Sequence, residues 1–406
     1  MLETPTRRAA TNMGELPLAE RGIVIATMMR PEGNTGVQTH ARHLLEGFSR
    51  ASIPCTLVTP FSAGRHWYAA FAARPLFLQH LNHNWSTRWY RHWHFLALRK
   101  ALLQQLSRSR AAVVVAQCPL AARATLEVRE QLGLDVTVAL VCHFNYSQAS
   151  EFREKGELTD EATSRRILQL EEEIAEEVDL MIYVSNWIRQ VMEGMRGVRP
   201  ASSAIIWNGL PTTVYDVGAS RIDLGLDQED LVLVNVGSLE PRKNQMGLVE
   251  FFAVLAVEYP RAHLLLIGDG PQRAEIGRKV EQLHLTNRVH LLGACSNVPS
   301  LLRIADIYVH YAKAETFGIV LIEAARAGLP IAALPVGGIP EVFAGLGGGV
   351  ELNADSSAPS MERLRPYLES EQLRRDVGSK MRSNFLKNFS VEAMIESYLR
   401  AIEQLV

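Results

Sequence analysis

Short aliphatic runs recur along the whole chain, separated by stretches with helical periodicity. The runs "GIVIATMM" (22–29), "VTVALVCH" (136–143), "LVLVNVGS" (231–238) and "HLLLIGDG" (263–270) are apolar at nearly every position and rich in β-branched or aliphatic residues. Strands of this kind are buried on both faces, which is typical of parallel sheets with helical crossovers. The pattern therefore predicts an α/β protein with enough strands for two sheets.

The strand-like runs fall into two groups on either side of an irregular stretch. Residues 210–229 include Pro211 and show no clear period, which predicts a linker. A chain of 406 residues is also longer than one hydrophobic core usually supports. We therefore predict two doubly wound, Rossmann-like domains that face each other across a cleft. The predicted division is a tail (1–20), a first domain (21–212), a second domain (213–389) and a C-terminal helix (390–406).

The last segment, "SVEAMIESYLRAIEQLV", predicts an amphipathic helix. Ser390 is a favourable N-cap residue, and apolar side chains repeat at helical spacing on one face. These side chains are Met394, Ile395, Leu399, Ile402 and Leu405. Such a face requires an apolar partner, and we predict that the helix packs back on the first domain.

Composition narrows the class of protein further. With 47% hydrophobic and 21% charged residues, the chain is near the globular average. Its four cysteines are scattered without zinc-site spacing, which fits a reduced compartment. The first 20 residues lack the apolar core of a signal peptide, and no run approaches the roughly 18 uncharged apolar residues of a membrane span. We expect a cytoplasmic protein that would meet a membrane only from its inner face.

Residues 315–323 read "ETFGIVLIE" and place a glutamate at each end of an apolar segment. Gly318 and Gly328 predict a helix between them, with Glu315 before its first turn and Glu323 inside it. Eight residues of helix span about 12 Å, which is too far for an acid–base pair or a shared metal. The two carboxylates are therefore expected to do separate jobs on one ligand. Two unrelated, solvated glutamates are the simpler alternative.

The start of this helix is a predicted phosphate site. Backbone N–H groups at a helix N-terminus have no partner within the helix and attract anions. The groups concerned belong to Phe317, Gly318 and Ile319. Flanking carboxylates can bind hydroxyl groups, as an acidic residue does on a ribose. The segment thus fits a sugar nucleotide, with the sugar at one end and the ribose at the other.

A second motif, "NVGSLEPRKNQ" (235–245), joins the end of a predicted strand to a turn that carries Arg242 and Lys243. Two fixed cations beyond a strand's carboxyl end suit a diphosphate leaving group, whose developing charge they would stabilise. The simpler alternative is an exposed pair of surface cations.

Two further positions lie at the ends of predicted strands in the first domain. Gly33 and Gly36 in "RPEGNTGVQTHARHLLEGF" permit a close approach of backbone to a phosphate or sugar, although a glycine-rich loop alone is a weak signal. His143 ends "VTVALVCH" and is expected to face the cleft, with a structural, hydrogen-bonded histidine as the alternative. The third glycine and the acidic residue of a dinucleotide site are missing.

Several common motifs are not found in the sequence. There is no D-x-D that could hold a divalent cation on a diphosphate, and no Walker A, G-x-S-x-G or H-E-x-x-H motif. We therefore expect neither a metal nor another cofactor, and a leaving group that is bound by protein donors alone.

Taken together, the motifs resemble those of the family 4 retaining glycosyltransferases, which have the GT-B fold and build bacterial surface polysaccharides or glycolipids. Five motifs occur in the family's usual order: "WNG" (207–209), "GSLEPRKN" (237–244), "IGDGP" (267–271), "ETFGIVLIE" (315–323) and "GGIPE" (337–341). The similarity is dense from about 180 to 345. Before that it rests on Gly36 and His143.

The resemblance implies roles for the candidate residues. Arg242 and Lys243 would bind the donor diphosphate. Glu315 would bind the transferred sugar, and Glu323 the ribose. Many members carry Arg directly after the glycine of the turn, whereas this chain has Ser238 there, so Arg242 would have to substitute.

For the remaining positions, the resemblance places the distal phosphate on the backbone of residues 317–319. Gly36 would close on the diphosphate from the first domain, and His143 would orient the sugar or the acceptor. The implied reaction moves a hexose from a UDP- or GDP-linked sugar to a hydroxyl of a glycan or lipid-linked acceptor, with retention and without a cofactor.

Other functions share this pattern. A sugar-nucleotide epimerase or an α-glucan phosphorylase keeps the fold with another reaction, and a non-catalytic sugar-nucleotide-binding protein is a third class. The two glutamates and Lys243 argue against the last.

Charge is distributed unevenly along the chain. Residues 47–126 contain ten Arg or Lys and no Asp or Glu, whereas residues 150–180 contain eleven acidic and four basic residues. Within the basic part, residues 81–110 interleave tryptophans at 85, 89 and 93 with arginines. This segment fits the core face of a helix whose arginines pair with the acidic stretch, an anionic membrane surface, or nucleic acid without a known binding module.

Overall fold

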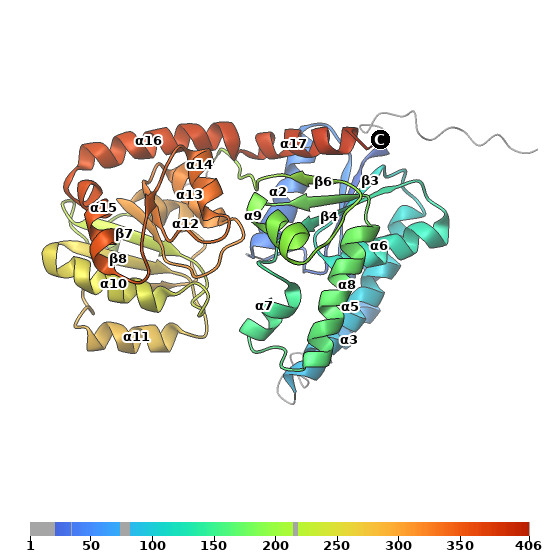
Figure 1. Ribbon diagram of the computed structural model, residues 1–406, viewed down its shortest axis with the longest axis horizontal. Coiled ribbons are helices and arrows are strands. Elements are labelled where there is room, and N and C mark those ends of the chain that lie inside the picture. Colours follow the sequence, from blue (N-terminus) through green and yellow to red (C-terminus); the bar gives the residue numbers. More distant parts are fainter. Residues whose placement is uncertain (1–20, 34, 74–81, 214–217, 406) are drawn as a thin grey trace, which may run out of the picture.

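The chain folds into two domains, each built on a parallel sheet of six strands (Figure 1). The computed structural model describes residues 21–33, 35–73, 82–213 and 218–405. The predicted tail 1–20 and part of the predicted linker, residues 214–217, lie outside the described residues. Two doubly wound domains of this kind were predicted from the apolar runs, and this prediction is confirmed.

The first sheet has the strand order β2-β1-β3-β4-β5-β6, with parallel pairing throughout. Its strands are β1 (Ile23–Ala26), β2 (Cys55–Val58), β3 (Val113–Ala116), β4 (Thr137–Cys142), β5 (Leu180–Tyr183) and β6 (Ser203–Ile205). The helices of this domain are α2 (Gly36–Arg50), α3 (Tyr68–Ala73), α5 (His83–Leu106), α6 (Pro119–Leu132), α7 (Gln148–Glu154), α8 (Glu161–Glu177) and α9 (Asn186–Arg189). Strands β1, β3 and β5 are buried at every position, as expected for strands covered by helices on both faces.

The second sheet has the order β12-β11-β10-β7-β8-β9 and is also parallel. Its strands are β7 (Leu231–Val236), β8 (Ala262–Ile267), β9 (Val289–Gly293), β10 (Ile307–His310), β11 (Ile331–Ala333) and β12 (Val350–Glu351). The helices are α10 (Gln245–Glu258), α11 (Arg273–Gln282), α12 (Val298–Arg303), α13 (Ile319–Ala327), α14 (Ile339–Leu346), α15 (Ser357–Glu369) and α16 (Glu371–Asn388).

The last helix, α17 (Val391–Glu403), leaves the second domain and packs on α2 of the first domain (Figure 1). The two helices approach closely at Gly47, where a Cβ would lie 2.5 Å from the side chain of Ile395. Tyr398 on α17 contacts His40 on α2 through a 3.1 Å hydrogen bond. The amphipathic face read from the sequence thus covers the first domain, as predicted.

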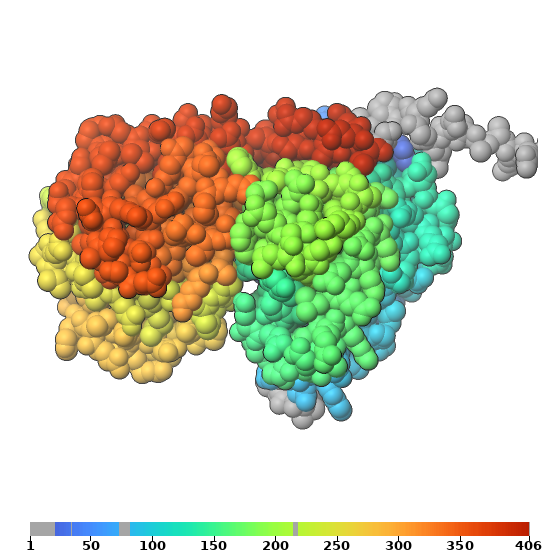
Figure 2. Space-filling model, in the orientation of Figure 1, coloured from blue at the N-terminus to red at the C-terminus, as the bar shows by residue number. Residues whose placement is uncertain are grey.

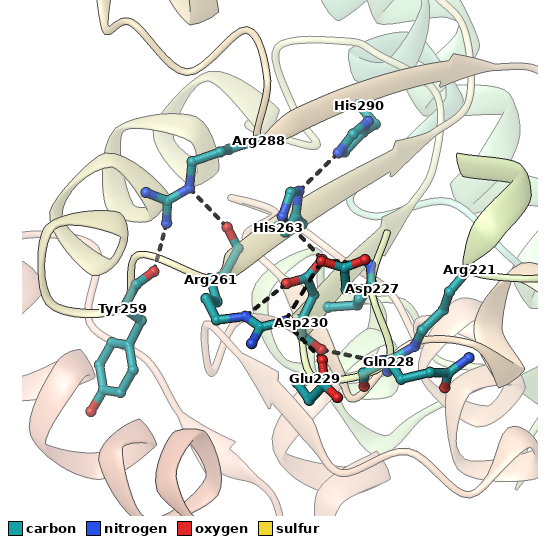
Figure 3. Close-up of polar contacts among 12 residues, drawn as sticks. Arg221, Asp227, Gln228, Glu229, Asp230, Tyr259, Arg261, His263, Arg288 and His290 are labelled. Atoms are coloured by element: carbon teal, nitrogen blue, oxygen red, sulfur yellow. Dashed lines mark hydrogen bonds and ion pairs between the residues drawn. The ribbon is translucent and has the colours of Figure 1, made fainter. Parts of the chain in front are cut away.

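An ion-pair network holds the amino-terminal edge of the second sheet (Figure 3). Arg261 lies within ion-pair distance of Asp227, Glu229 and Asp230, and His263 lies between Asp230 and the ring of His290. None of the predicted site residues takes part. This edge is opposite to the carboxyl ends of the strands, where the chemistry is expected.

Helix α5 contains most of the basic, tryptophan-rich segment and agrees in part with the core-packing interpretation. The indole of Trp89 donates to the carbonyl of Ala70 (2.7 Å), and Trp93 packs against the hydrophobic core. Arg88 pairs with Asp160 in the acidic stretch, as the core-packing interpretation expects. Trp85, however, is 63% exposed, so the three tryptophans do not form one buried face. No helix in the described ranges is both long and apolar enough to cross a bilayer.

Helix α2 buries two histidines that make the stability of the protein pH-dependent. Burial lowers the pKa of His43 to about 4, and neighbouring Arg42 adds to this effect. Burial also lowers the pKa of His40 well below its ordinary value, and nearby His143 adds to this effect. A group of this kind binds fewer protons in the folded than in the unfolded protein.

The stabilisation from such a histidine is present above about pH 6.5 and is lost as the pH falls toward 4. As the pH falls from 7 to 5, His43 becomes protonated in the unfolded protein but not in the folded one. We predict that this effect of His43 alone lowers the free energy of unfolding by up to about 2 kcal/mol. Urea unfolding at several pH values measures this loss, and His43→Gln should remove it. The exposed His92→Gln variant is the control and should keep the slope of the parent protein. An equal slope for His43→Gln would contradict the prediction.

Candidate active site

The predicted site residues come from the carboxyl ends of strands in both sheets. Lys243 lies in the turn after β7, and Glu315 lies in the loop between β10 and α13. His143 directly follows β4, and Gly36 begins the helix after β1. The second domain and the first face each other at these strand ends, with a notch between them that is visible in the space-filling view (Figure 2).

Lys243 and Glu315 form an ion pair in this region. The Nζ atom of Lys243 lies 2.5 Å from Oε2 of Glu315, and the two side chains are only 13% and 11% exposed. Burial alone would raise the pKa of the Glu315 carboxyl. The charge of Lys243, with smaller effects from His310 and Arg242, outweighs burial and holds this pKa well below its usual range. Glu315 is therefore a carboxylate at neutral pH.

His310 is a buried neighbour that sequence reasoning missed. Its Nε2 atom lies 3.4 Å from Oε2 of Glu315, which is a weak polar contact rather than a well-formed hydrogen bond. Burial lowers the pKa of His310, so the imidazole is neutral and orients the carboxylate as a dipole. The signal that singled out His143, a histidine that ends a buried strand, is also present here in β10 and could have found His310.

Backbone from the "GGIPE" turn supports the loop that carries Glu315. The N–H of Gly338 donates to the carbonyl of Glu315 (2.9 Å). A Cβ at Gly338 would lie 2.2 Å from the carbonyl oxygen of Thr316, and one at Gly337 would lie 1.9 Å from that of Glu315. Both glycines are therefore required for this close approach of two loops, and Gly337 also has a left-handed φ of 58°.

Glu323 lies in the second turn of α13, beyond the loop that carries Glu315, and is partly buried. Burial raises the pKa of Glu323, and Arg326 on the next turn opposes this effect. The pKa of Tyr308 on β10 is raised by burial first and then by the negative charges of Glu323 and Glu315. The carboxylates at the two ends of "ETFGIVLIE" thus both influence one buried group, although Glu315 lies in the loop and Glu323 in the helix.

The start of α13 faces the start of α2 across the domain interface. A Cβ placed on Gly36 would contact the side chain of Ile319 at 3.6 Å. Gly318 caps α13 in a left-handed conformation without a side-chain hydrogen bond. Among the described residues, none accepts a hydrogen bond from the N–H groups of residues 317–319. Two positive helix ends that face each other would favour an anion between them.

His143 forms a hydrogen bond with Gln117, the residue that directly follows β3. Its Nε2 atom lies 3.0 Å from Oε1 of Gln117, and because an amide oxygen can only accept a hydrogen bond, this contact assigns the proton to Nε2 and leaves Nδ1 as the acceptor nitrogen of the ring. Burial lowers the pKa of His143 to about 4. A neutral imidazole of this tautomer can accept a hydrogen bond from a hydroxyl group at Nδ1.

Arg242 is anchored by protein groups on both sides. One guanidinium nitrogen donates to the carbonyl of Ala314 (3.2 Å), and the other pairs with Glu240 (2.9 Å). The guanidinium lies directly beside the Glu315 loop and contributes to the low pKa of Glu315. Arg242 therefore adds positive charge to the site, while Lys243 makes the direct contact with the carboxylate.

The two domains also contact each other through hydrogen bonds that the sequence did not predict. Thr316 donates to Oδ1 of Asn145 (2.7 Å), and Ser185 donates to the carbonyl of Thr316 (2.7 Å). Glu341 accepts hydrogen bonds from the N–H of Asn186 and the indole of Trp207, both at 2.6 Å. No local pattern could reveal these pairs, because each joins residues more than 100 positions apart.

A cavity of about 880 Å³ lies elsewhere and contains none of the predicted site residues. It opens at the amino-terminal ends of strands in the first sheet, near residues 133–137 and Asp179. Ligands of open parallel sheets bind at the opposite edge, so the cleft between the domains remains the candidate site.

Two Rossmann-like domains that face each other with their strand ends define the GT-B class of fold. The family profile described as Glycosyltransferase Family 4 matches residues 34–214, and the profile described as Glycosyl transferases group 1 matches residues 216–384. Together the two profiles cover every strand of the two sheets except β1. The chain belongs to glycosyltransferase family 4.

Curated relatives match part of the chain. N-acetyl-alpha-D-glucosaminyl L-malate synthase of Bacillus anthracis is 30% identical over 196 residues, which are 48% of this chain and 51% of that protein. D-inositol 3-phosphate glycosyltransferase of Gordonia bronchialis is 27% identical over 250 residues, which are 57% of this chain and 55% of that protein. The chain spans about half the length of these relatives.

Solved structures match over nearly the whole chain. Sucrose-phosphate synthase of Thermosynechococcus elongatus matches with a TM-score of 0.72 at 19% identity. The match covers 95% of this chain and 99% of the synthase chain. HepE of Anabaena, solved with UDP and glucose, matches with a TM-score of 0.69 at 17% identity. The match covers 94% of this chain and 100% of the HepE chain. This likeness shows the fold.

The ion pair at the centre of the site generates a prediction about stability. Removing one partner of a buried pair leaves an uncompensated charge, whereas removing both does not. We predict that Lys243→Met lowers the free energy of unfolding by roughly 3 kcal/mol and that the double variant Lys243→Met/Glu315→Gln recovers most of this loss. Urea unfolding of the two single variants and the double variant measures the coupling. Additive losses would contradict a buried, coupled pair.

Proposed function

We propose that the protein is a retaining hexosyltransferase that takes its donor from a UDP- or GDP-linked sugar. The observation that carries this proposal is the pair of helix ends at Gly36 and Ile319, which face each other beside the ion pair of Lys243 and Glu315. Two positive helix ends favour a diphosphate between them, and a cation beside them compensates the charge that develops on departure. HepE, a structural neighbour, was solved with UDP-glucose, which supports a nucleotide sugar as the donor.

In this proposal each residue has a separate part. The N–H groups at the tip of α13 bind the distal phosphate, and Lys243 with Arg242 stabilises the leaving diphosphate. Glu315 accepts hydrogen bonds from hydroxyls of the sugar, and Glu323 accepts them from the ribose. The neutral His143 accepts a hydrogen bond from the sugar or from the acceptor near the anomeric carbon.

The proposed reaction follows a front-side displacement. The acceptor oxygen forms a bond to the anomeric carbon on the face from which the bond to the phosphate oxygen breaks. The departing phosphate oxygen receives the proton of the acceptor hydroxyl. This scheme needs no second carboxylate about 5 Å from the first, as a retaining hydrolase does. It is also compatible with a metal-independent site, because the cations are side chains.

A panel of UDP- and GDP-hexoses, assayed for release of the nucleotide with and without an acceptor, tests the proposal. Glu315→Gln and Lys243→Ala should lower kcat by on the order of 100-fold, because each removes charge complementarity from the transition state. The exposed neighbour Lys313→Ala is the matched control and should keep full activity. Proton NMR of the product reports the anomeric configuration. Full activity in Glu315→Gln, or inversion in the product, would refute this reaction.

We also propose a lipid-linked or polysaccharide-precursor acceptor, reached by a protein that acts in the cytoplasm at an anionic membrane surface. Trp85 on α5 is 63% exposed and Tyr68 at the start of α3 is 46% exposed, and both lie in the basic part of the first domain. Exposed aromatic residues among cations are typical of membrane interfaces.

Flotation with vesicles that contain anionic lipid tests the membrane contact. We expect the protein to float with these vesicles at low salt and Trp85→Ser to float less, because the exposed indole would insert at the interface. Neutral vesicles are the control. Failure of the parent protein to float with anionic vesicles would contradict the proposal.

A further inference from the structure

Helix α7 brings a carboxylate to the cleft that the proposed reaction does not use. The helix follows β4 and His143 after a short loop, and Ser147 caps its N-terminus. Figure 1 shows α7 on the side of the first domain that faces the second. Its first turn carries Glu151, which is partly exposed.

Only one oxygen of Glu151 is engaged by the described part of the protein. Its Oε1 atom accepts a hydrogen bond from the N–H of Asn145 at 3.3 Å. No described residue donates to Oε2 or forms an ion pair with it. Because an ionised carboxylate has about four acceptor positions, Glu151 has free capacity for a ligand.

Asn145 connects this carboxylate to the donor side of the site. The backbone of Asn145 donates to Glu151, and its side chain accepts from the hydroxyl of Thr316 at 2.7 Å. Thr316 directly follows Glu315, and both Asn145 and Thr316 are buried. One residue therefore fixes the distance between Glu151 of the first domain and the loop that carries Glu315 of the second.

Charges around Glu151 come from both domains. Burial raises the pKa of its carboxyl, whereas Lys155, the N–H of Asn145 and Arg242 lower it, and Glu154 adds a small opposing effect. Arg242, which lies beside Lys243 in the second domain, thus contributes to the charge environment of Glu151 in the first. Glu151 and Glu154 balance Lys155 on this helix, and Arg153 pairs with Glu161, so α7 itself brings no excess positive charge with which to hold an anion.

We propose that Glu151 binds the acceptor, with Oε2 accepting a hydrogen bond from a hydroxyl of a neutral sugar or polyol. This inference rests on the proposed glycosyl transfer and adds the chemical class of the acceptor. A carboxylate makes a strong, charge-assisted bond to a hydroxyl group but repels a phosphate or another carboxylate. The acceptor is thus uncharged at its reacting end, unlike malate or an inositol phosphate, which the names of two relatives contain.

The test compares Glu151→Gln with Glu154→Gln, an exposed neighbour on the same helix. For each protein, nucleotide release from the donor is measured in water alone and with two sets of acceptors. The neutral set is glycerol, myo-inositol and octyl glucoside, and the anionic set is myo-inositol 1-phosphate and L-malate. We expect Glu151→Gln to lower kcat/KM for the neutral acceptors about tenfold or more, as the loss of a charge-assisted hydrogen bond does. Hydrolysis of the donor in water should be unchanged, and Glu154→Gln should behave as the parent protein.

Two kinds of failure can be told apart. If the parent protein turns over no nucleotide sugar, the proposed function falls and this inference falls with it. If the parent protein hydrolyses the donor but transfers to no neutral acceptor, or prefers the anionic set, only the acceptor class is wrong. If transfer to neutral acceptors is the same in Glu151→Gln and in the parent protein, the role of Glu151 is wrong.

Discussion

The buried ion pair between Lys243 and Glu315 is the interaction on which the geometry of the cleft depends. It joins the turn after β7 to the loop after β10, two strands that are neighbours in the second sheet. Removing two charges from water is costly, so the pair persists only because further groups hold each partner. For Glu315 these groups are the N–H of Gly338 on its carbonyl oxygen and the neutral ring of His310 near its carboxylate.

The same loop also determines where the proposed anion site lies. Residues 315–318 lead directly into α13, so the position of Glu315 fixes the position of the helix tip. A fixed carboxylate close to a phosphate site would repel the phosphate if its charge were not compensated. Lys243 provides this compensation, with Arg242 nearby. The arrangement would therefore allow the proposed sugar-binding carboxylate and the proposed phosphate-binding helix end to share one short segment.

Much of the fold could be predicted from the sequence, because buried parallel strands leave continuous apolar runs such as "VTVALVCH". The glycines in "GGIPE" and "IGDGP" could likewise be recognised as turns. What they contact could not be predicted: Gly338 lies against the carbonyl of Thr316, and Gly268 lies against that of Gly237. Loop-to-loop contacts of this kind depend on the three-dimensional order of the strands, which local patterns do not contain.

The candidate site shows the same division between local and long-range information. Glu315, Lys243 and His143 lie at strand ends, and strand ends can be read from the sequence. Asn145 and Thr316 are ordinary polar residues in irregular segments, and nothing in their local sequence indicates that they meet across 171 positions. Trp85 gives the opposite case, since its spacing from Trp89 suggested a shared buried face that the helix does not form.

The contacts between the domains have a consequence for catalysis. Thr316, Ser185 and Asn145 join the domains beside the site, and Glu341 joins them at the N-terminus of α9. Apolar packing accompanies these hydrogen bonds: Phe317 and Phe389 belong to the same hydrophobic cluster as the first sheet, and Trp207 of the first domain stacks on Phe389. Helix α17 adds a further connection, because it continues from the second domain and packs on α2 of the first. Asn145, in the short loop between His143 and Glu151, holds this part of the first domain against the loop that carries Glu315, so the residues proposed for the acceptor and for the sugar share one hydrogen-bonded contact.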